Sequence, residues 1–229
     1  MKVRRLHPFD MPPRDAIRLQ MWLASKVVAK GSIRRTLKRV AGLDCAVDHE
    51  GHVHGVVVVC EAPDWKVVET VSASAPAPMP YVPGLLSFRE TPILLEALRK
   101  LRSTPDLLLV DGHGLAHPRG LGIASHIGLH VDVPVIGVGK SILVGTHEKA
   151  GKKRGDWRPL TFKGRRIGVC LTLRDGVAPV YVSVGNRIGL IPAARKVLEC
   201  ATRYRLPEPI RHADAISRKR ARAARVAVP

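Results

Sequence analysis

The sequence is poor in aromatic side chains and in long apolar runs. Only 4% of its 229 residues are Phe, Trp or Tyr, which argues against a broad platform for stacking the bases of a single strand. Its longest apolar runs, such as 55–60 and 107–110, are far too short to cross a bilayer. The N-terminus is basic but lacks an unbroken apolar segment, so no secretion signal is predicted. We therefore expect a cytoplasmic protein without a membrane partner.

Cysteine is also scarce. The four cysteines form no C-x-x-C pair, which argues against a zinc ribbon and favours a reducing compartment. A chain of this length buries enough apolar surface to fold without a disulfide or a structural metal. The cysteines are Cys45, Cys60, Cys170 and Cys200.

Acidic residues are few, and positive charge is in excess. The 38 Lys and Arg against 19 Asp and Glu give a formal net charge of +19. Such a surplus predicts attraction to a polyanion, which in cytoplasm is nucleic acid. The basic residues concentrate at 1–40, 149–166 and 195–225. Contact with the phosphate backbone is the expected mode; the alternative is a surface that only keeps the protein in solution.

Helix and strand signals alternate along the chain, which predicts an α/β protein. Strands are expected near 42–47, 53–61, 65–71, 106–110, 133–138, 167–173 and 180–184, and helices near 14–29, 87–101, 120–129, 191–201 and 209–226. Residues 149–158 are expected to form a basic loop. No linker is long enough to separate two domains, so residues 1–229 are expected to form one domain. Its basic tail, from about residue 217, is either an arm that contacts DNA or a frayed helix.

Two acidic residues stand out because they interrupt apolar strands. Asp44 lies inside the strand 42–47, and Asp111 follows the buried run 107–110. Ligands of α/β sheets gather at the carboxyl ends of strands, which suits Asp111. If the two strands are neighbours, the carboxylates converge and need a divalent cation between them, for which oxygen ligands favour Mg²⁺ or Mn²⁺. The alternative is that each Asp only caps a turn or a helix.

A segment rich in proline carries a third acid and an exposed aromatic. Ser87 and Glu90 fit a capping box, in which Glu90 would bond to the backbone of Ser87; the alternative places Glu90 with the other acids. Just before them, two prolines flank Tyr81 and Val82. This stiff tip could push side chains between stacked bases, or it could fold back onto the core.

Several motifs in the same order resemble those of endonuclease V, the deoxyinosine 3′-endonuclease family. The resemblance extends from about residue 15 to residue 217. It rests on Leu43-Asp44, on the stretch from Pro80 to Glu90, on Asp111-Gly112-His113-Gly114 with Ala116-His117-Pro118-Arg119, on Gly137 to Ser141, and on Leu206 to Asp214.

The resemblance implies a ribonuclease H-like fold, an α/β arrangement with a mixed five-stranded sheet flanked by helices. It also implies a catalytic set and three binding roles. The catalytic set is Asp44, Glu90, Asp111, Asp214 and Lys140, with Asp44, Asp111 and Glu90 as metal ligands. Pro80, Tyr81, Val82 and Pro83 match the family's wedge, Gly84, Leu86, Gly112 and Ile123 match its base pocket, and His117 and Lys140 match residues that contact nucleic acid.

The expected activity is Mg²⁺-dependent hydrolysis of the second phosphodiester bond 3′ to deoxyinosine, with Mn²⁺ able to substitute. The products would carry 3′-hydroxyl and 5′-phosphate ends, and the partner would be DNA containing deoxyinosine, bound by a monomer. One alternative is an endoribonuclease specific for inosine in RNA, which would use the same catalytic residues. The other is a non-catalytic nucleic-acid-binding protein whose acids only cap secondary structure.

Overall fold

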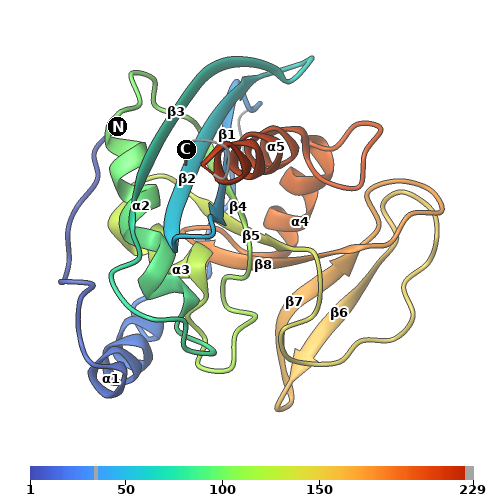
Figure 1. The fold of residues 1–229 in the computed structure, drawn as a ribbon. Helices are drawn as coiled ribbons and strands as arrows, with labels where there is room; N and C mark the ends of the chain where they lie inside the picture. The colour runs from blue at the N-terminus through green and yellow to red at the C-terminus, as the bar shows by residue number, and fades with distance from the viewer. Residues whose placement is uncertain (34–35, 225–229) are drawn as a thin grey trace.

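The computed structural model describes residues 1–33 and 36–224. Its strands are β1 (Arg39–Val47), β2 (His52–Glu61), β3 (Lys66–Pro76), β4 (Leu107–Asp111), β5 (Val135–Gly139), β6 (Trp157–Phe162), β7 (Arg165–Leu171) and β8 (Val180–Asn186). They form one mixed sheet in the order β3-β2-β1-β4-β5-β8-β7-β6 (Figure 1). The pairs β1–β4 and β4–β5 are parallel, and the other pairs are antiparallel.

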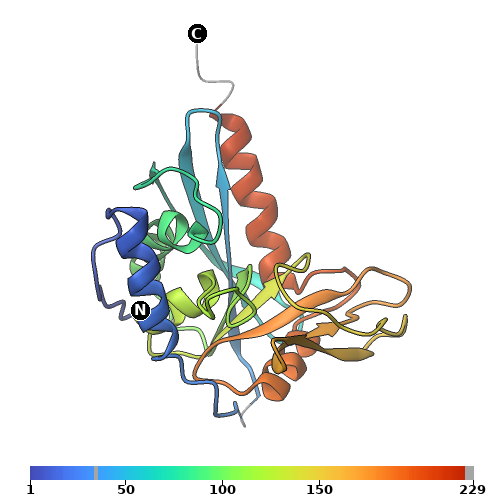
Figure 2. The ribbon, with the colours of Figure 1, turned by 90° about the horizontal axis from the view of Figure 1, so that it is seen from below.

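Helices cover both faces of this sheet. They are α1 (Pro13–Ala24), α2 (Leu86–Arg99), α3 (Ile123–His130), α4 (Leu190–Glu199) and α5 (Glu208–Ala223). Figure 2 shows α1, α2 and α3 on one side of the strands and α5 on the other. Each side has its own apolar core, and the sheet separates the two. In the described part of the chain, none of the helices combines the length and the apolar character that a bilayer crossing requires.

The expected count of five strands is wrong, because the sheet has eight. Strands β3-β2-β1-β4-β5 are neighbours in this sheet, and β8, β7 and β6 continue it beyond β5. The sequence predicts β7 and β8 as strands but not β6, which begins inside the expected basic loop and contains Pro159. Proline removes a ladder donor and is therefore confined to sheet edges. The strand β6 is one edge, and β3, which ends at Pro76, is the other.

Parallel pairing of β1 with β4 brings the two strand acids together. Leu43 lies opposite Val110, so Asp44 and Asp111 are the next residues along two neighbouring strands. Side chains alternate between the faces of a strand, and Leu43 and Val110 both belong to the core beneath α2 and α3. Asp44 and Asp111 therefore belong to the opposite face, which α5 covers.

The beginning of α5 sits directly on β1 because Gly42 has no side chain. A Cβ at Gly42 would lie 2.1 Å from the carbonyl carbon and oxygen of Pro209. Backbone therefore packs on backbone at this point, and α5 runs on past Asp44. The expected C-terminal tail continues this helix as far as Ala223; Arg225 lies outside the described residues.

Candidate active site

Three carboxylates meet between the sheet and α5. Single oxygens of Asp44, Asp111 and Asp214 all lie within 4.8 Å of one another. The first two come from β1 and β4, and Asp214 comes from α5. Residues far apart in the sequence thus form an acidic trio, as the sequence predicts for Asp44 and Asp111.

Lys140 and Ser217 hold this acidic trio in place. The Lys140 ammonium forms an ion pair with Asp111 at 2.5 Å and a second ion pair with Asp214. It follows β5, the strand next to β4. On α5, the Ser217 hydroxyl donates a hydrogen bond to Oδ2 of Asp44. Lys140 thus pairs with two of the three acids, and Ser217 donates to the third.

Burial and mutual repulsion favour the protonated acids. Burial, followed by the charge of Asp111, raises the pKa of Asp44 to about 7. Burial also raises the pKa of Asp111, although Lys140 opposes the increase. For Lys140, burial alone lowers the pKa, but Asp111 and Asp214 outweigh burial and raise it. A site that holds these carboxylates ionised at neutral pH needs more positive charge than Lys140 provides.

Glu90 approaches the acidic trio from the other face of the sheet. The capping-box alternative is wrong, because α2 begins at Leu86 after Leu85 as N-cap, and Ser87 lies buried inside the helix. Burial, followed by the charge of Asp44, raises the pKa of Glu90 to about 8. Glu90 is therefore electrostatically coupled to Asp44, but it is outside the group whose ligand atoms lie within 4.8 Å.

A cavity of about 200 Å³ opens beside the acidic trio. Its lining includes all four residues expected to form the base pocket, Gly84, Leu86, Gly112 and Ile123. Tyr81, His113, His117 and the 141–143 loop complete much of the wall. Gly112 directly follows Asp111, so the cavity and the acidic trio share a stretch of backbone.

Two glycines in the cavity wall allow neighbouring side chains to pack closely against the backbone. Gly112 has φ +141°, and a Cβ there would lie 2.6 Å from Cγ2 of Ile123. Gly84 has φ +80°, and a Cβ there would lie 2.4 Å from the Arg119 guanidinium. Both positions use conformations that L side chains rarely adopt, so substitution would strain the backbone as well as fill space.

A partly buried polar network anchors the Gly84 loop. Arg119 Nη2 donates to the Gly84 carbonyl at 2.7 Å, and Gln20 Nε2 donates to the same oxygen at 2.9 Å. Gln20 Oε1 accepts from Arg119 Nε at 2.5 Å. The sequence analysis did not predict that Gln20 and Arg119 anchor this loop. The position of Gln20 between the buried residues Ala16 and Leu23 of α1 is the signal that could have found it.

The segment expected to form a wedge divides its side chains between solvent and core. Tyr81 is 64% exposed at the rim of the cavity. Val82 is half-buried and packs against the core under α2. Pro80 and Pro83 are exposed on either side. The tip therefore presents Tyr81 outward, while Val82 fixes it to the body.

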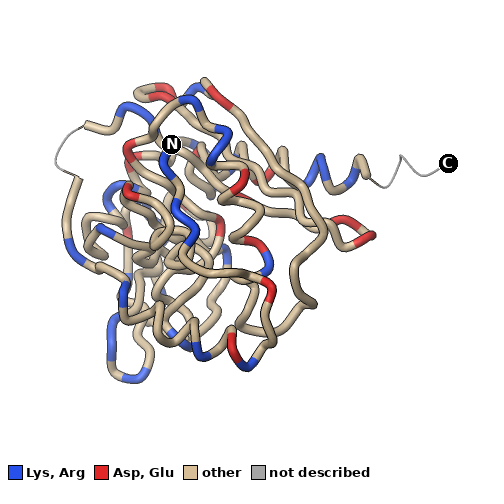
Figure 3. The backbone as a smooth tube through the Cα atoms, turned by 90° about the vertical axis from the view of Figure 1, so that its left-hand side faces the viewer, with Lys and Arg blue, Asp and Glu red and all other residues tan. Residues whose placement is uncertain are grey.

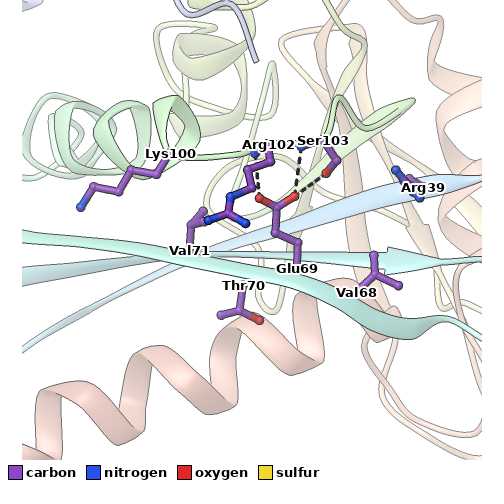
Figure 4. A pocket seen from close by; sticks show the side chains of 8 residues that line it. All are labelled: Arg39, Val68, Glu69, Thr70, Val71, Lys100, Arg102 and Ser103. Atoms are coloured by element: carbon purple, nitrogen blue, oxygen red, sulfur yellow. Dashed lines mark hydrogen bonds between the residues drawn. The ribbon is translucent and has the colours of Figure 1, made fainter.

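A larger cavity of about 600 Å³ lies away from the acids, between β3 and the end of α2 (Figure 4). Its acid, Glu69, accepts hydrogen bonds from the Arg102 and Ser103 amides and from the Ser103 hydroxyl, at 2.5–3.1 Å. These bonds tie the 102–103 loop to β3, so we assign Glu69 an anchoring role.

Positive charge is distributed over much of the surface. Figure 3 shows Lys and Arg positions on many segments of the chain, including the end of α5 that extends from the body. Arg218, next to the acidic trio on α5, pairs with Asp214 at 2.9 Å. A backbone of phosphates following this helix would therefore meet basic side chains on its way to the acids.

Without a divalent cation, the protein is expected to lose stability as the pH rises from about 5 to 8. The folded-state pKa values of Asp44 and Glu90, about 7 and about 8, exceed the unfolded values near 4. The stabilisation is full below the unfolded pKa and is lost as the pH rises through the folded pKa. We expect the thermal midpoint at pH 8 to lie several degrees below that at pH 5.5. Mg²⁺ should reduce this difference; an unchanged difference would contradict a cation site.

Comparisons with known proteins find relatives over nearly the whole chain. A family model described as Endonuclease V matches residues 21–215. Endonuclease V of Trichormus variabilis is 43% identical over 221 residues, which are 96% of this chain and 100% of the relative. The crystal structure of Endonuclease V from Streptomyces avermitilis has a TM-score of 0.90 at 37% identity, covering 98% of this chain and 99% of its own.

A further structure, of Endonuclease V from Ciona intestinalis, contains a 24mer DNA with an inosine followed by a ribo-adenosine. Its TM-score is 0.78 at 26% identity, with 92% of this chain and 98% of that chain covered. These similarities confirm the family resemblance and the ribonuclease H-like α/β fold class that the sequence predicts.

Proposed function

Since this chain belongs to the Endonuclease V family and is a nuclease, we propose that it cleaves DNA at deoxyinosine, the product of adenine deamination. The bond hydrolysed is the second phosphodiester on the 3′ side of the lesion, which leaves 3′-hydroxyl and 5′-phosphate ends. The relative from Ciona intestinalis, which holds inosine-containing DNA, supports inosine as the recognised base.

The observation that carries this proposal is the junction between the cavity and the acidic trio. Asp111 belongs to the trio and its neighbour Gly112 lines the cavity. Lys140 pairs with the trio, and its neighbour Ser141 also lines the cavity. A base held in the cavity would therefore keep the next nucleotides of the same DNA strand beside the carboxylates.

The donor chemistry of the trio fits Mg²⁺, with Mn²⁺ as a substitute. All three side chains offer carboxylate oxygens, the hard ligands that these cations prefer. Two of them, Asp111 and Asp214, already pair with the Lys140 ammonium, so positive charge is stabilised at this place. Asp44, Asp111 and Asp214 would hold the ion, which when bound supplies charge stabilisation at the phosphate and acidifies a bound water.

The surrounding residues orient the acids and the phosphate. The Ser217 hydroxyl fixes one oxygen of Asp44, which leaves the other oxygen for a ligand. Lys140, with a side chain 30% exposed, is placed to donate to a non-bridging phosphate oxygen and to stabilise the charge that develops there. Arg218 extends the positive surface along α5, where it can meet further phosphates of the DNA strand.

The cavity would receive the flipped base. Flipping costs a few kcal/mol and is least expensive for a weakly paired base such as hypoxanthine. The backbone at Gly84 and Gly112 can approach the base closely because no Cβ intervenes. Burial, followed by the charge of Arg119, lowers the pKa of His117 to about 4. A neutral His117 is suited to a hydrogen bond with the base edge rather than to an ion pair with phosphate.

Tyr81→Ala is expected to weaken binding to an inosine duplex more than to an undamaged duplex. The exposed ring would replace the stacking lost when the base flips, a contribution of about 1–3 kcal/mol, so the affinity ratio should fall about tenfold. Fluorescence anisotropy in Ca²⁺ or without metal measures both affinities. The matched control is Trp22→Ala, because Trp22 is 57% exposed on α1. Equal losses on both duplexes would contradict the wedge role.

Glu90→Gln is expected to lower turnover about tenfold while leaving the fold intact. Glutamine cannot ionise, so the variant lacks the carboxyl whose pKa burial and the charge of Asp44 raise to about 8, and any limb of the pH–rate profile that follows this ionisation should disappear. Glu96→Gln on the same helix is the control, because Glu96 is exposed and pairs with Arg99 at the surface. A profile identical to wild type would return Glu90 to a structural role. The prediction that Glu90 itself ligates the metal would gain support from a weaker Mg²⁺ affinity.

The test of the proposal is to map the cut in a labelled duplex that carries one deoxyinosine, with and without Mg²⁺. We expect one Mg²⁺-dependent nick at the second phosphodiester 3′ to the lesion, and no nick in a duplex with adenosine. A cut at another position, or equal cutting of both duplexes, would overturn it.

Analytical ultracentrifugation of the same preparation tests the expected monomer.

The alternative of an inosine-specific endoribonuclease keeps support, and the alternative of a non-catalytic binding protein is wrong. The ribo-adenosine after the inosine in the Ciona intestinalis complex favours an enzyme that accepts ribose beside the lesion, so inosine RNA is a second candidate substrate. Cleavage rates on matched DNA and RNA strands with one inosine separate the two. Membership of a nuclease family excludes the non-catalytic alternative.

A further inference from the structure

Three histidines form a second cluster, on the face of the sheet opposite the acidic trio. His126 and His130 are one turn apart on α3, and His7 belongs to the N-terminal segment. One ring nitrogen of each lies within 4.8 Å of the others. His126 and His130 are fully buried and His7 is half-buried. The proposed nuclease chemistry uses none of them.

The backbone fixes the tautomers of two of these rings. Nδ1 of His7 lies 2.6 Å from the Pro8 carbonyl oxygen, and Nδ1 of His130 lies 2.7 Å from the Arg4 carbonyl oxygen. A carbonyl oxygen only accepts, so each Nδ1 carries the proton and each Nε2 carries a lone pair. Metal-binding histidines are held in this way, with the second nitrogen donating to a carbonyl or carboxylate.

The third ring leaves buried lone pairs without partners. Nε2 of His7 lies 2.9 Å from Nε2 of His126. Because His7 accepts there, His126 donates, and its Nδ1 then holds a lone pair. In the described part of the chain, neither Nδ1 of His126 nor Nε2 of His130 has a hydrogen-bond partner, and both atoms are buried. A buried polar atom without a partner is unfavourable, so the cluster is incomplete as a hydrogen-bond network.

The rings are also in the charge state that metals require. Burial lowers the pKa of His7, lowers that of His126 well below its usual value and lowers that of His130 to about 4. The aromatic rings of Phe9 and Phe88, with centroids 4.6–4.8 Å from the nearest histidine of the cluster, maintain this apolar environment. The imidazoles are therefore neutral at pH 7, and protons do not compete with a metal.

We propose that His7, His126 and His130 bind one transition-metal ion of the zinc class through their Nε2 atoms, with water as the fourth ligand. Three imidazoles and no carboxylate select Zn²⁺, Co²⁺ or Ni²⁺ over Mg²⁺. Zn–N distances of about 2.0–2.1 Å place tetrahedral ligands about 3.3 Å apart, so His7 and His126 need to separate by only a few tenths of an ångström.

Metal binding at this site neither releases a proton nor takes one up. The ion takes the place of the proton between His7 and His126, and that proton moves to the free Nδ1 of His126. The bound ion would clamp the N-terminal segment to α3. The first residue of α3, Ile123, lines the cavity beside the acidic trio, so the clamp would stiffen one wall of the base pocket.

Co²⁺ binding in excess Mg²⁺ tests this site, because Mg²⁺ saturates carboxylates and tetrahedral Co²⁺ absorbs visible light. We expect one equivalent of Co²⁺ per chain in the wild type, displaced by Zn²⁺. His130→Leu should weaken Co²⁺ binding at least tenfold and remove the rise in thermal midpoint that Zn²⁺ causes. His7→Gln, in the half-buried segment, is the second variant in case His130→Leu does not fold.

Two controls locate the binding. Asp111→Asn alters the acidic trio, and His52→Gln alters the surface hairpin in which His52 and His54 face Asp48. Both should retain one equivalent of Co²⁺ with unchanged absorption. The proposal is overturned if the wild type takes up no Co²⁺ in excess Mg²⁺. It is equally overturned if His130→Leu and His7→Gln bind as the wild type does, or if either control abolishes binding.

Discussion

Asp111→Asn is expected to lower cleavage of an inosine duplex by about 10³-fold or more, which corresponds to about 4 kcal/mol in the barrier. Asparagine preserves the shape of the side chain but removes one of three charges that hold the proposed cation. It also removes the partner that Lys140 meets at 2.5 Å. Single-turnover rates at saturating Mg²⁺ measure the loss.

The same substitution should not destabilise the metal-free protein. Burial and the charge of Asp214 raise the pKa of Asp111, although Lys140 opposes the increase, so a neutral amide avoids the burial cost and the repulsion that an ionised carboxylate meets at pH 8. We therefore expect a thermal midpoint at or above that of wild type without metal, and little further increase on adding Mg²⁺. Affinity for DNA should be retained.

Asp64→Asn is the control for Asp111→Asn, because Asp64 is 67% exposed and pairs with Lys66 at the edge strand. It should leave rate, Mg²⁺ response and affinity unchanged. Cleavage by Asp111→Asn within tenfold of wild type would remove the acidic trio from the chemistry. Loss of folding would instead show that Asp111 is structural, and circular dichroism distinguishes the two results.

Local sequence pattern is sufficient to single out Asp44 and Asp111 on their strands, but it does not place Asp214 beside them. An acid inside an apolar strand, such as Asp44, or at the end of one, such as Asp111, is conspicuous in this basic chain. That their strands pair in parallel, with Leu43 opposite Val110, is a tertiary fact that only the motif resemblance anticipates. Asp214 reaches the site because α5 seats its backbone on Gly42, an approach that no local pattern reveals.

Other features were hidden because local signals competed with tertiary ones. The S-x-x-E pattern predicts Ser87 as the N-cap, but the N-cap is Leu85, two residues earlier, so Ser87 lies buried inside the helix and Glu90 is coupled to Asp44. Strand β6 is hard to predict because a basic loop precedes it and because it contains Pro159, which an edge position tolerates. Ser217 could have been predicted, since it lies three residues after Asp214 and therefore on the same face of α5.

Lys140→Gln is expected to lower turnover about 10²–10³-fold, the effect typical of losing one preorganised donor at a developing oxyanion. It should also change the pH–rate profile. Lys140 opposes the rise in the pKa values of Asp44 and Asp111, so its removal raises both. The acid limb, along which carboxylates must ionise to hold the cation, should therefore move to higher pH, and more Mg²⁺ should be needed at pH 7.

The direction of that shift separates Lys140 from a residue that only binds DNA. Lys66→Gln, at a side chain 80% exposed on the edge strand, should leave the profile in place. A variant that lost only a phosphate contact would raise KM without moving the acid limb. If Lys140→Gln weakens binding alone, Lys140 acts on the DNA backbone. If the acid limb moves upward with a large loss in kcat, Lys140 acts on the carboxylates and on the reacting phosphate together, as its position between Asp111 and Asp214 leads us to expect.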